Sequence, residues 1–105
     1  MNEKIEALYA RIGQALNHAV GGKFRTAHAR VEMADDFGSV GVFFEVRQGD
    51  FHYRTDEDDE LYELFTQLRR QCIQAGMGSW SQATFTLSQG GNFSLQFGFE
   101  DISHM

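Results

Sequence analysis

The sequence predicts an α+β fold: a two-layer sandwich in which two helices cover one face of an antiparallel sheet of about five strands. Two segments carry apolar residues at helical spacing, about five others read as strands, and the turns between the strands are short. Strands joined by short turns run antiparallel. The expected order is α-β-β-β-α-β-β, in a single domain that spans residues 1–105.

The first helix is expected at residues 4–19, because apolar residues recur three and four positions apart and Gly21-Gly22 supplies a stop. These apolar positions are Ile5, Leu8, Ile12, Ala15 and Leu16. A strand follows within residues 23–33, where apolar and polar residues alternate. The apolar set is Ala27, Ala29, Val31 and Met33, and the polar set is Thr26, His28, Arg30 and Glu32. One face of this strand should therefore contact solvent.

Two further strands are expected at residues 39–47 and 51–55, joined by the short turn Gln-Gly-Asp. The turn Ala-Asp-Asp-Phe-Gly-Ser precedes them. In the first of these strands Val40, Val42, Phe44 and Val46 share one side. Phe43 lies on the other side, which suggests that the second face also has partial cover.

The second helix is expected from about residue 56 to 75, with an apolar stripe of Leu61, Leu64, Phe65, Leu68 and Cys72. Two strands close the chain at residues 83–88 and 93–100, the last of which has the clearest alternation in the sequence. The core between this helix and the sheet is expected to bury six side chains. They are Leu64, Phe65, Leu68, Phe85, Phe97 and Phe99.

Composition narrows the function classes. Hydrophobic residues make up 42% of the 105 residues, and no apolar run approaches the roughly 20 residues of a membrane span. The charged, amphipathic N-terminal segment does not resemble a secretion signal, so a cytoplasmic location is expected. The net charge of −6 disfavours nucleic acid and anionic membranes as partners. A basic protein remains a suitable partner.

No catalytic or metal-binding pattern is present. The four histidines, His18, His28, His52 and His104, have no metal-ligand spacing. Ser79 and Ser81 are not part of a nucleophile motif, and the glycine pairs do not form a phosphate-binding loop. The single cysteine, Cys72, falls on the apolar face of a helix and excludes an internal disulfide. The expected protein has no catalytic residues, metal or cofactor.

Acidic residues gather at the start of the second helix. They are Asp56, Glu57, Asp58, Asp59 and Glu60, with Glu63 one turn further along. A calcium loop needs a glycine in its middle, which this run lacks. A helix start explains about two or three of the acids, since Thr55 can cap the helix and carboxylates complement its dipole. The excess favours a surface that binds a positively charged partner, and a merely solvated face is the alternative.

Trp80 is the only tryptophan and stands between the second helix and the next strand. A tryptophan in such a position commonly covers the edge of the core. The alternative is an anchor in a protein interface, a role in which tryptophan is enriched. Both interpretations stay open from the sequence, and Trp80 joins the acidic residues as a candidate partner contact.

The C-terminal third carries a recognisable set of motif positions. They are Leu64, Phe65, Leu68 and Arg69; Trp80 and Ser81; Phe85, Thr86 and Leu87; Gly90 and Gly91; and Phe93, Phe97, Phe99 and Glu100. In these positions the chain resembles the YezG-like family of bacterial immunity proteins. The segments before them are compatible with the family but less specific. Asn92 stands where a lysine is common in the family, and Phe99-Glu100 replaces the usual Tyr-Asp.

The resemblance implies a small cytoplasmic protein that binds and neutralises the toxic C-terminal domain of a cognate bacterial polymorphic or contact-dependent toxin, often a nuclease. The acidic composition agrees, because a nuclease domain carries positive charge to hold nucleic acid. An acidic secretion-chaperone-like or other protein-binding α+β domain is the alternative. A domain that binds a small molecule would need a polar cluster on an apolar face, and none is found. The oligomeric state stays open.

Overall fold

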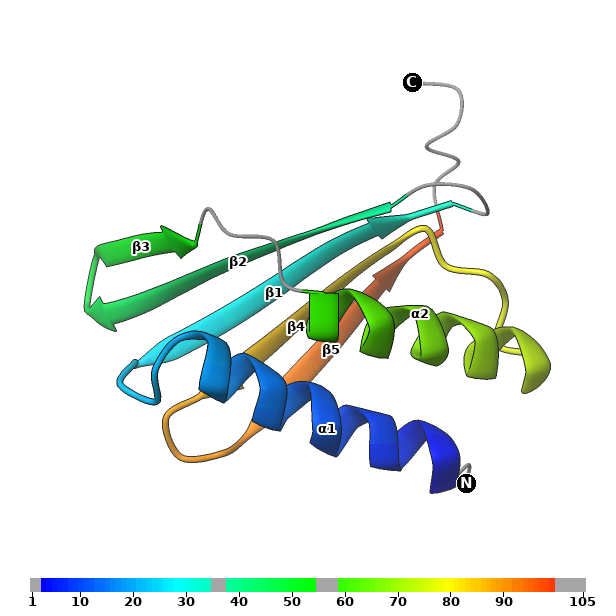
Figure 1. The fold of residues 1–105 in the computed structure, drawn as a ribbon, viewed down its shortest axis with the longest axis horizontal. Coiled ribbons are helices and arrows are strands. Elements are labelled where there is room, and N and C mark those ends of the chain that lie inside the picture. Colours follow the sequence, from blue (N-terminus) through cyan, green and yellow to red (C-terminus); the bar gives the residue numbers. More distant parts are fainter. Residues whose placement is uncertain (1–2, 35–37, 55–58, 100–105) are drawn as a thin grey trace.

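The computed structural model describes residues 3–34, 38–54 and 59–99 (Figure 1). Its elements are α1 (Glu3–Ala19), β1 (Thr26–Met33), β2 (Gly38–Arg47), β3 (Asp50–Arg54), α2 (Asp59–Gln74), β4 (Gln82–Ser88) and β5 (Phe93–Gly98). The five strands form one sheet in the order β3-β2-β1-β4-β5, and all neighbours are antiparallel. The predicted α+β fold and element order are confirmed.

Both helices lie on the same face of the sheet and run in opposite directions beside each other (Figure 1). Every residue of the two predicted apolar stripes is buried. The exposed faces of the helices carry the charged residues. This division explains why each segment is helical: an amphipathic stripe becomes stable when it packs against a second apolar layer.

Helix α1 ends at two glycines in left-handed conformations, Gly21 with φ 78° and Gly22 with φ 77°. The Gly21 amide donates to the carbonyl of His18, and the Gly22 amide donates to that of Asn17. These bonds satisfy carbonyl groups that the last turn of a helix leaves without partners. The predicted stop at this glycine pair is confirmed.

The inner face of the sheet is built from alternating residues of β1 and β4. On β1, Ala27, Ala29, Val31 and Met33 are buried, as predicted. On β4, Ala83, Phe85 and Leu87 are buried. Alanines at the centre of the sheet leave room for the large side chains above them, among which Phe65 is fully buried.

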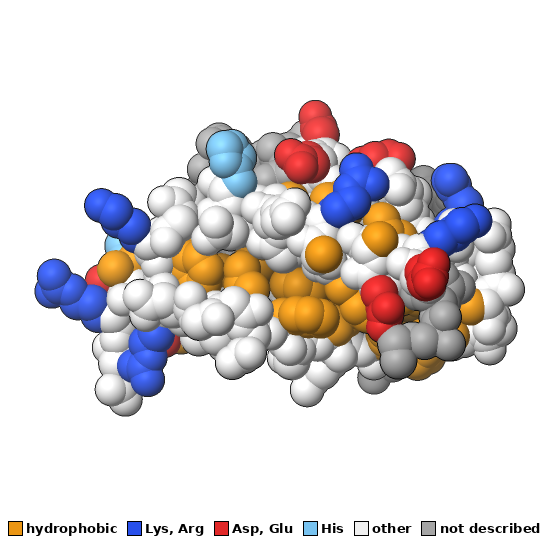
Figure 2. Space-filling model, turned by 90° about the horizontal axis from the view of Figure 1, so that it is seen from below, with side chains coloured by type: hydrophobic (Ala, Val, Ile, Leu, Met, Phe, Trp, Pro, Cys, Tyr) orange, Lys and Arg blue, Asp and Glu red, His pale blue; other side chains and the backbone are white. Residues whose placement is uncertain are grey.

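The prediction for β5 is partly wrong. Phe97 is half-buried, but Phe99, one residue beyond the end of β5, is 60% exposed and its ring lies on the side of Gly78 where a Cβ would stand, outside the core. Phe93 is also 49% exposed. The physical reason is the position of β5 at the edge of the sheet, beyond the area that two helices cover. Figure 2 shows the result: hydrophobic side chains form a band between the helix layer and the sheet layer, on the side where α1 and the β4–β5 turn lie.

Smaller differences concern element ends. The first strand begins at Thr26, later than predicted, and the last ends at Gly98. The described part of α2 begins at Asp59, so the predicted helical residues 56–58 lie outside the described residues. Val46 was predicted to share the inner side of β2, but it is 40% exposed because a bulge between Glu45 and Arg47 shifts the register with β3.

Candidate functional site

Neither described helix covers the outer face of the sheet, because α1 and α2 both lie on the inner face (Figure 1). The strand register brings the outward side chains of neighbouring strands into rows, and one row crosses the sheet through Tyr53, Phe43, His28, Thr86 and Ser94. Most outward positions on β1, β4 and β5 are polar. The β2–β3 end of the row is aromatic, which is unusual for a face in contact with water.

Three rings form the aromatic cluster of this row. The His28 and Phe43 rings are stacked, with centroids 4.5 Å apart and an interplanar angle of 14°. Phe43 and Tyr53 are 5.8 Å apart in a tilted arrangement. Tyr53 is 73% exposed, and Phe51 on the same strand is 48% exposed. The alternation of β2 predicted Phe43 on this side of the strand, but nothing in the sequence pattern predicted its contact with Tyr53.

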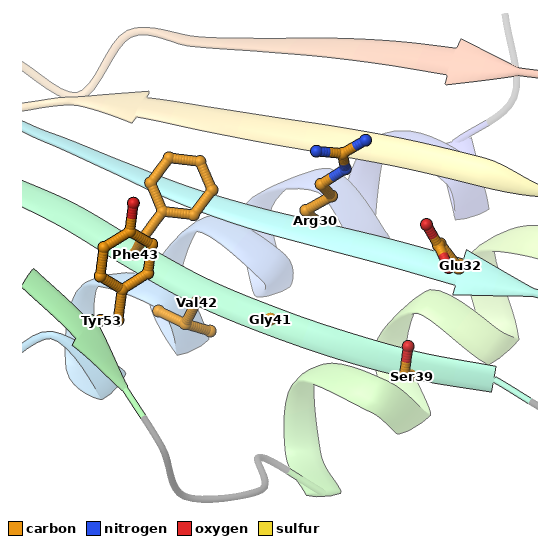
Figure 3. A pocket seen from close by; sticks show the side chains of 7 residues that line it. All are labelled: Arg30, Glu32, Ser39, Gly41, Val42, Phe43 and Tyr53. Carbon is orange, nitrogen blue, oxygen red and sulfur yellow. The ribbon is translucent and has the colours of Figure 1, made fainter.

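A hollow of about 510 Å³ opens on the same face beside the cluster (Figure 3). Its lining comes from three strands: Arg30 and Glu32; Ser39, Gly41, Val42 and Phe43; and Tyr53. The two aromatic rings stand at one end of the hollow, and Glu32 and Ser39 stand at the other. Gly41 lies between them and contributes no side chain. The missing side chain is what creates the depression.

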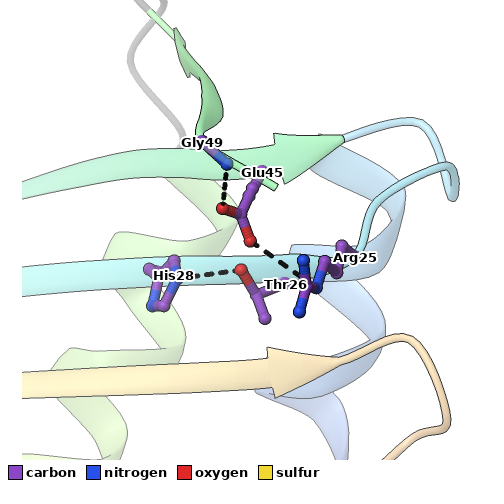
Figure 4. A network of polar contacts seen from close by, with 5 residues as sticks. All are labelled: Arg25, Thr26, His28, Glu45 and Gly49. Carbon is purple, nitrogen blue, oxygen red and sulfur yellow. Dashed lines mark hydrogen bonds and ion pairs between the residues drawn. The ribbon is translucent and has the colours of Figure 1, made fainter. Parts of the chain in front are cut away.

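A polar network holds the β2–β3 hairpin against the start of β1 (Figure 4). The Gly49 amide donates a 2.7 Å hydrogen bond to Oε2 of Glu45, and Nε of Arg25 lies 3.9 Å from Oε1. The backbone adds a bond from the Arg25 amide to the Glu45 carbonyl, at 2.6 Å. Glu45 therefore fixes the hairpin turn, and with it the strand that presents Tyr53.

His28 lies between two hydroxyl groups and an aromatic ring. Its Nδ1 is 3.1 Å from Oγ1 of Thr86, and its Nε2 is 3.3 Å from Oγ1 of Thr26. Burial lowers the pKa of His28 below its ordinary value of 6.5, and the nearby Glu45 carboxylate offsets only part of that effect. The ring is therefore neutral at pH 7, and the stack on Phe43 is between two uncharged rings.

The lowered pKa of His28 predicts a pH-dependent loss of stability. The unfolded chain binds a proton near pH 6.5 more readily than the folded chain does, so the free energy of unfolding should fall as the pH drops below about 6.5. Above that pH the contribution should be constant. Urea denaturation of the parent and of His28→Gln at pH 7.5 and pH 5 measures it. The variant should lose less stability on acidification than the parent, and equal losses would contradict the assignment to His28.

The acidic residues of the sequence prediction are only partly described. Asp59 and Glu60 stand exposed in the first turn of α2, and Glu63 is exposed one turn further along. Asp56, Glu57 and Asp58 lie outside the described residues. Glu63 also lines a groove between α1 and α2 that contains three cationic side chains, Lys4, Arg11 and Arg70. Negative charge is thus concentrated at the first turn of α2 and is partly balanced at Glu63.

Trp80 is placed in the core, with a side chain only 1% exposed. Its ring stacks on Phe97 at 5.4 Å, and its carbonyl accepts a 2.8 Å hydrogen bond from Nε of Arg69. Its indole N–H is buried with no hydrogen-bond partner among the described residues. Burial raises the pKa of the neighbouring Cys72 thiol, and the indole of Trp80 offsets part of that rise. Trp80 covers the core, and in this structure it is not accessible to a partner.

Within residues 3–34, 38–54 and 59–99, no three His, Cys, Asp or Glu side chains gather in a way that could hold a metal ion. Neither helix of the described chain is long and apolar enough to cross a membrane. What the described surface offers is a set of contact features: an aromatic cluster, a hollow beside it, and an acidic helix start.

Known proteins identify the family. The sequence profile described as "Immunity protein YezG-like" matches residues 42–105, more than half of the chain. The Immunity protein YezG of Bacillus subtilis (strain 168) is 27% identical over 113 residues, which cover 93% of this chain and 75% of that protein. The Immunity protein YezG of Bacillus spizizenii (strain ATCC 23059 / NRRL B-14472 / W23) is 25% identical over 114 residues, which cover 94% and 71%. The matched segment contains Phe43, Tyr53 and the whole acidic run. This chain belongs to the YezG-like family of immunity proteins.

Proposed function

We propose that this protein binds and neutralises the toxic C-terminal domain of a cognate bacterial toxin of the polymorphic or contact-dependent kind, and that this domain is a nuclease. Neutralisation is by occupation of the toxin surface, without catalysis, in the cytoplasm of the cell that carries both genes. Membership of the immunity family supports the role. The observation that carries it is the open sheet face, where exposed aromatic side chains stand beside a hollow.

The aromatic cluster suits a protein partner because aromatic residues are enriched at the energetic centres of interfaces. Tyr53 combines a large exposed ring with a hydroxyl group, so it can contribute both apolar area and a hydrogen bond. The polar side chains of Glu32, Ser39 and Arg30 around the hollow supply the rim that such an interface needs. The hairpin network at Glu45 keeps Tyr53 in place before the partner arrives, which reduces the entropy lost on binding.

The charge of the chain supports a basic partner. The net charge is −6, and a nuclease domain must be positively charged where it holds nucleic acid. We propose that the acidic run Asp56–Glu60, together with Glu63, attracts that surface during approach. Long-range attraction of this kind raises the association rate more than it raises the final affinity.

Co-expression of the toxin domain with this protein tests the function directly. The two should purify as a complex, and the toxin domain should degrade nucleic acid only after it has been separated from this protein. A toxin domain that stays fully active with this protein in excess would contradict neutralisation. A complex that forms but inhibits an activity other than nucleic acid cleavage would retain the immunity role and reject the nuclease.

Replacing Glu60 and Glu63 with glutamine should slow association with the toxin domain several-fold at low salt, with the difference shrinking as salt rises, because ions screen the attraction. Stability should change by only a few tenths of a kcal/mol, since both side chains are exposed. Stopped-flow or surface-binding kinetics across a salt series gives the rates.

The matched control is Glu3→Gln with Glu6→Gln, which removes the same charge from exposed positions in the first turn of α1. If both double variants slow association equally, only the total charge of the chain matters. If neither double variant slows association, the acidic residues at the start of α2 stabilise the helix and do not attract the toxin domain.

A further inference from the structure

The two edges of the sheet differ in their protection against strand addition. At the β3 edge, Asp50 and His52 place polar groups on the outer strand, and the register with β2 is interrupted by a bulge. Both features discourage another strand from pairing. The β5 edge has neither. Its sequence from Phe93 to Gly98 contains no charge and no proline, and its pairing with β4 is continuous over six residues.

The hydrogen-bonding groups at the β5 edge can be assigned from the ladder with β4. The Ser88 amide donates to the Asn92 carbonyl at 2.8 Å, so the backbone groups of this pair face each other, and those of every second pair along the ladder do the same. Ser94 and Gln96 therefore turn their backbone groups towards β4. The N–H and C=O groups of Phe93, Leu95 and Phe97 face away from β4, and no other described strand pairs with them.

The side chains of these three residues lie on the helix side of the sheet, where cover is incomplete. Phe93 is 49% exposed although it touches Phe85 and Tyr9, with ring centroids 5.2 and 5.8 Å apart. Leu95 and Phe97 are half-buried. All three therefore leave part of their apolar surface in contact with solvent. The outer backbone edge of β5 and these partly exposed apolar side chains thus occur at the same place.

We propose that β5 pairs with β5 of a second copy of this chain, so that two sheets join into one of ten strands. An antiparallel pair of identical strands is related by a two-fold axis, the symmetry of most protein dimers. Centred on Leu95, the pairing puts Leu95 opposite its own copy and Phe93 opposite Phe97, so the free backbone groups bond to one another. The partly exposed Phe93, Leu95 and Phe97 of the two copies then lie on the same face of the joined sheet, the face that carries the helices.

Self-complementarity and charge both favour a second copy of this chain as the partner of the β5 edge. Two chains of −6 repel each other over most of their surfaces, but β5 carries no charge, so the copies can meet there without opposing like charges. The same register places Ser94 opposite Gln96 of the partner subunit. This is a non-hydrogen-bonded pair, the type in which the Cα atoms come closer together, about 4.5 Å apart. On the outer face, therefore, only small or neutral polar groups meet.

The test introduces charge at those two positions. Ser94 and Gln96 are exposed in the described chain, so Ser94→Lys with Gln96→Lys should leave the fold intact. In the dimer each new ammonium group would face another directly, which should weaken association about tenfold or more. Light scattering after size-exclusion chromatography, over a dilution series of the full chain, gives the mass of the parent and of the variant. The parent should have the mass of two chains and the variant that of one.

A charge-matched control and a rescue complete the experiment. Gln14→Lys with Asn17→Lys adds the same charge on exposed positions of α1 and should remain dimeric. The variant Ser94→Glu with Gln96→Glu should also be monomeric alone, but mixing it with the lysine variant should restore a dimer of one copy of each, because opposite charges then face each other.

A parent of one-chain mass at every concentration would overturn the proposal, as would a Ser94→Lys, Gln96→Lys variant as dimeric as the parent. A third outcome is that the parent is monomeric and binds the toxin domain, the Ser94→Lys, Gln96→Lys variant does not bind it, and the control variant does. The β5 edge would then pair with a strand of the toxin, and the dimer would be rejected.

Discussion

Replacing Phe65 with alanine should lower the free energy of unfolding by about 3–5 kcal/mol, a large share of the total for a chain of this size. Phe65 lies on α2 with a fully buried side chain, over the inner face of the sheet. Its removal forfeits the burial of an aromatic ring and leaves a cavity that neighbouring residues on two layers can only partly fill. Urea denaturation of parent and variant measures the difference, provided that the free energy of unfolding falls with urea concentration at the same slope in both.

Phe99→Ala is the matched control, because it removes the same group from a position that is 60% exposed. Its effect should be less than about 1 kcal/mol, since most of the ring is already in water. The sequence alone predicted both rings to be buried, so the pair also tests the correction made by the structure. Equal losses for the two variants would mean that Phe99 belongs to the core after all, and a stable Phe65→Ala would contradict helix-on-sheet packing.

The success of the sequence prediction in α1, α2, β1 and β4 has a physical cause. Each of these elements packs most of one face into the core, so its hydrophobic period reports its environment directly. The segment of β5 and Phe99 has the clearest alternation in the chain, and nevertheless Phe93 is 49% exposed and Phe99, just beyond the strand, is 60% exposed. Alternation shows which residues share a face, but it does not show whether another layer covers that face. Cover depends on strand order and on the width of the helix layer, which are properties of the whole fold.

The candidate site was harder to predict for the same reason. The acidic residues are adjacent in the chain, so they were visible as a run. The aromatic cluster joins His28, Phe43 and Tyr53 from three strands, and only the pairing of β1 with β2 and of β2 with β3 brings the rings together. Local pattern cannot give that register. Trp80 shows the same limit: the sequence left open a cover over the edge of the core and an interface anchor, and only the fold places its ring in the core beside Phe97.

Tyr53→Ala should weaken binding of the toxin domain by at least about 2 kcal/mol, roughly a 30-fold rise in Kd, if the outer face is the contact surface. The ring is 73% exposed in the free protein, so the change in stability should stay below about 1 kcal/mol. Calorimetry or equilibrium binding to the toxin domain gives the affinity, and urea denaturation gives the stability. Phe99→Ala removes an exposed ring away from this face and should bind as the parent does.

Gly41→Val tests the same surface by addition. The backbone of Gly41 has no left-handed conformation, and the nearest atom to an added Cβ is the Arg30 carbonyl oxygen at 4.0 Å, so a Cβ fits here in ordinary contact and the valine side chain would project into the hollow. Valine also suits a strand better than glycine, so the variant should be as stable as the parent or more so, by up to about 1 kcal/mol. It would nevertheless fill the hollow beside Phe43 and keep a toxin side chain out. A variant that gains stability while losing affinity cannot owe its weaker binding to unfolding, and normal binding by both Gly41→Val and Tyr53→Ala would exclude the outer face as the contact surface.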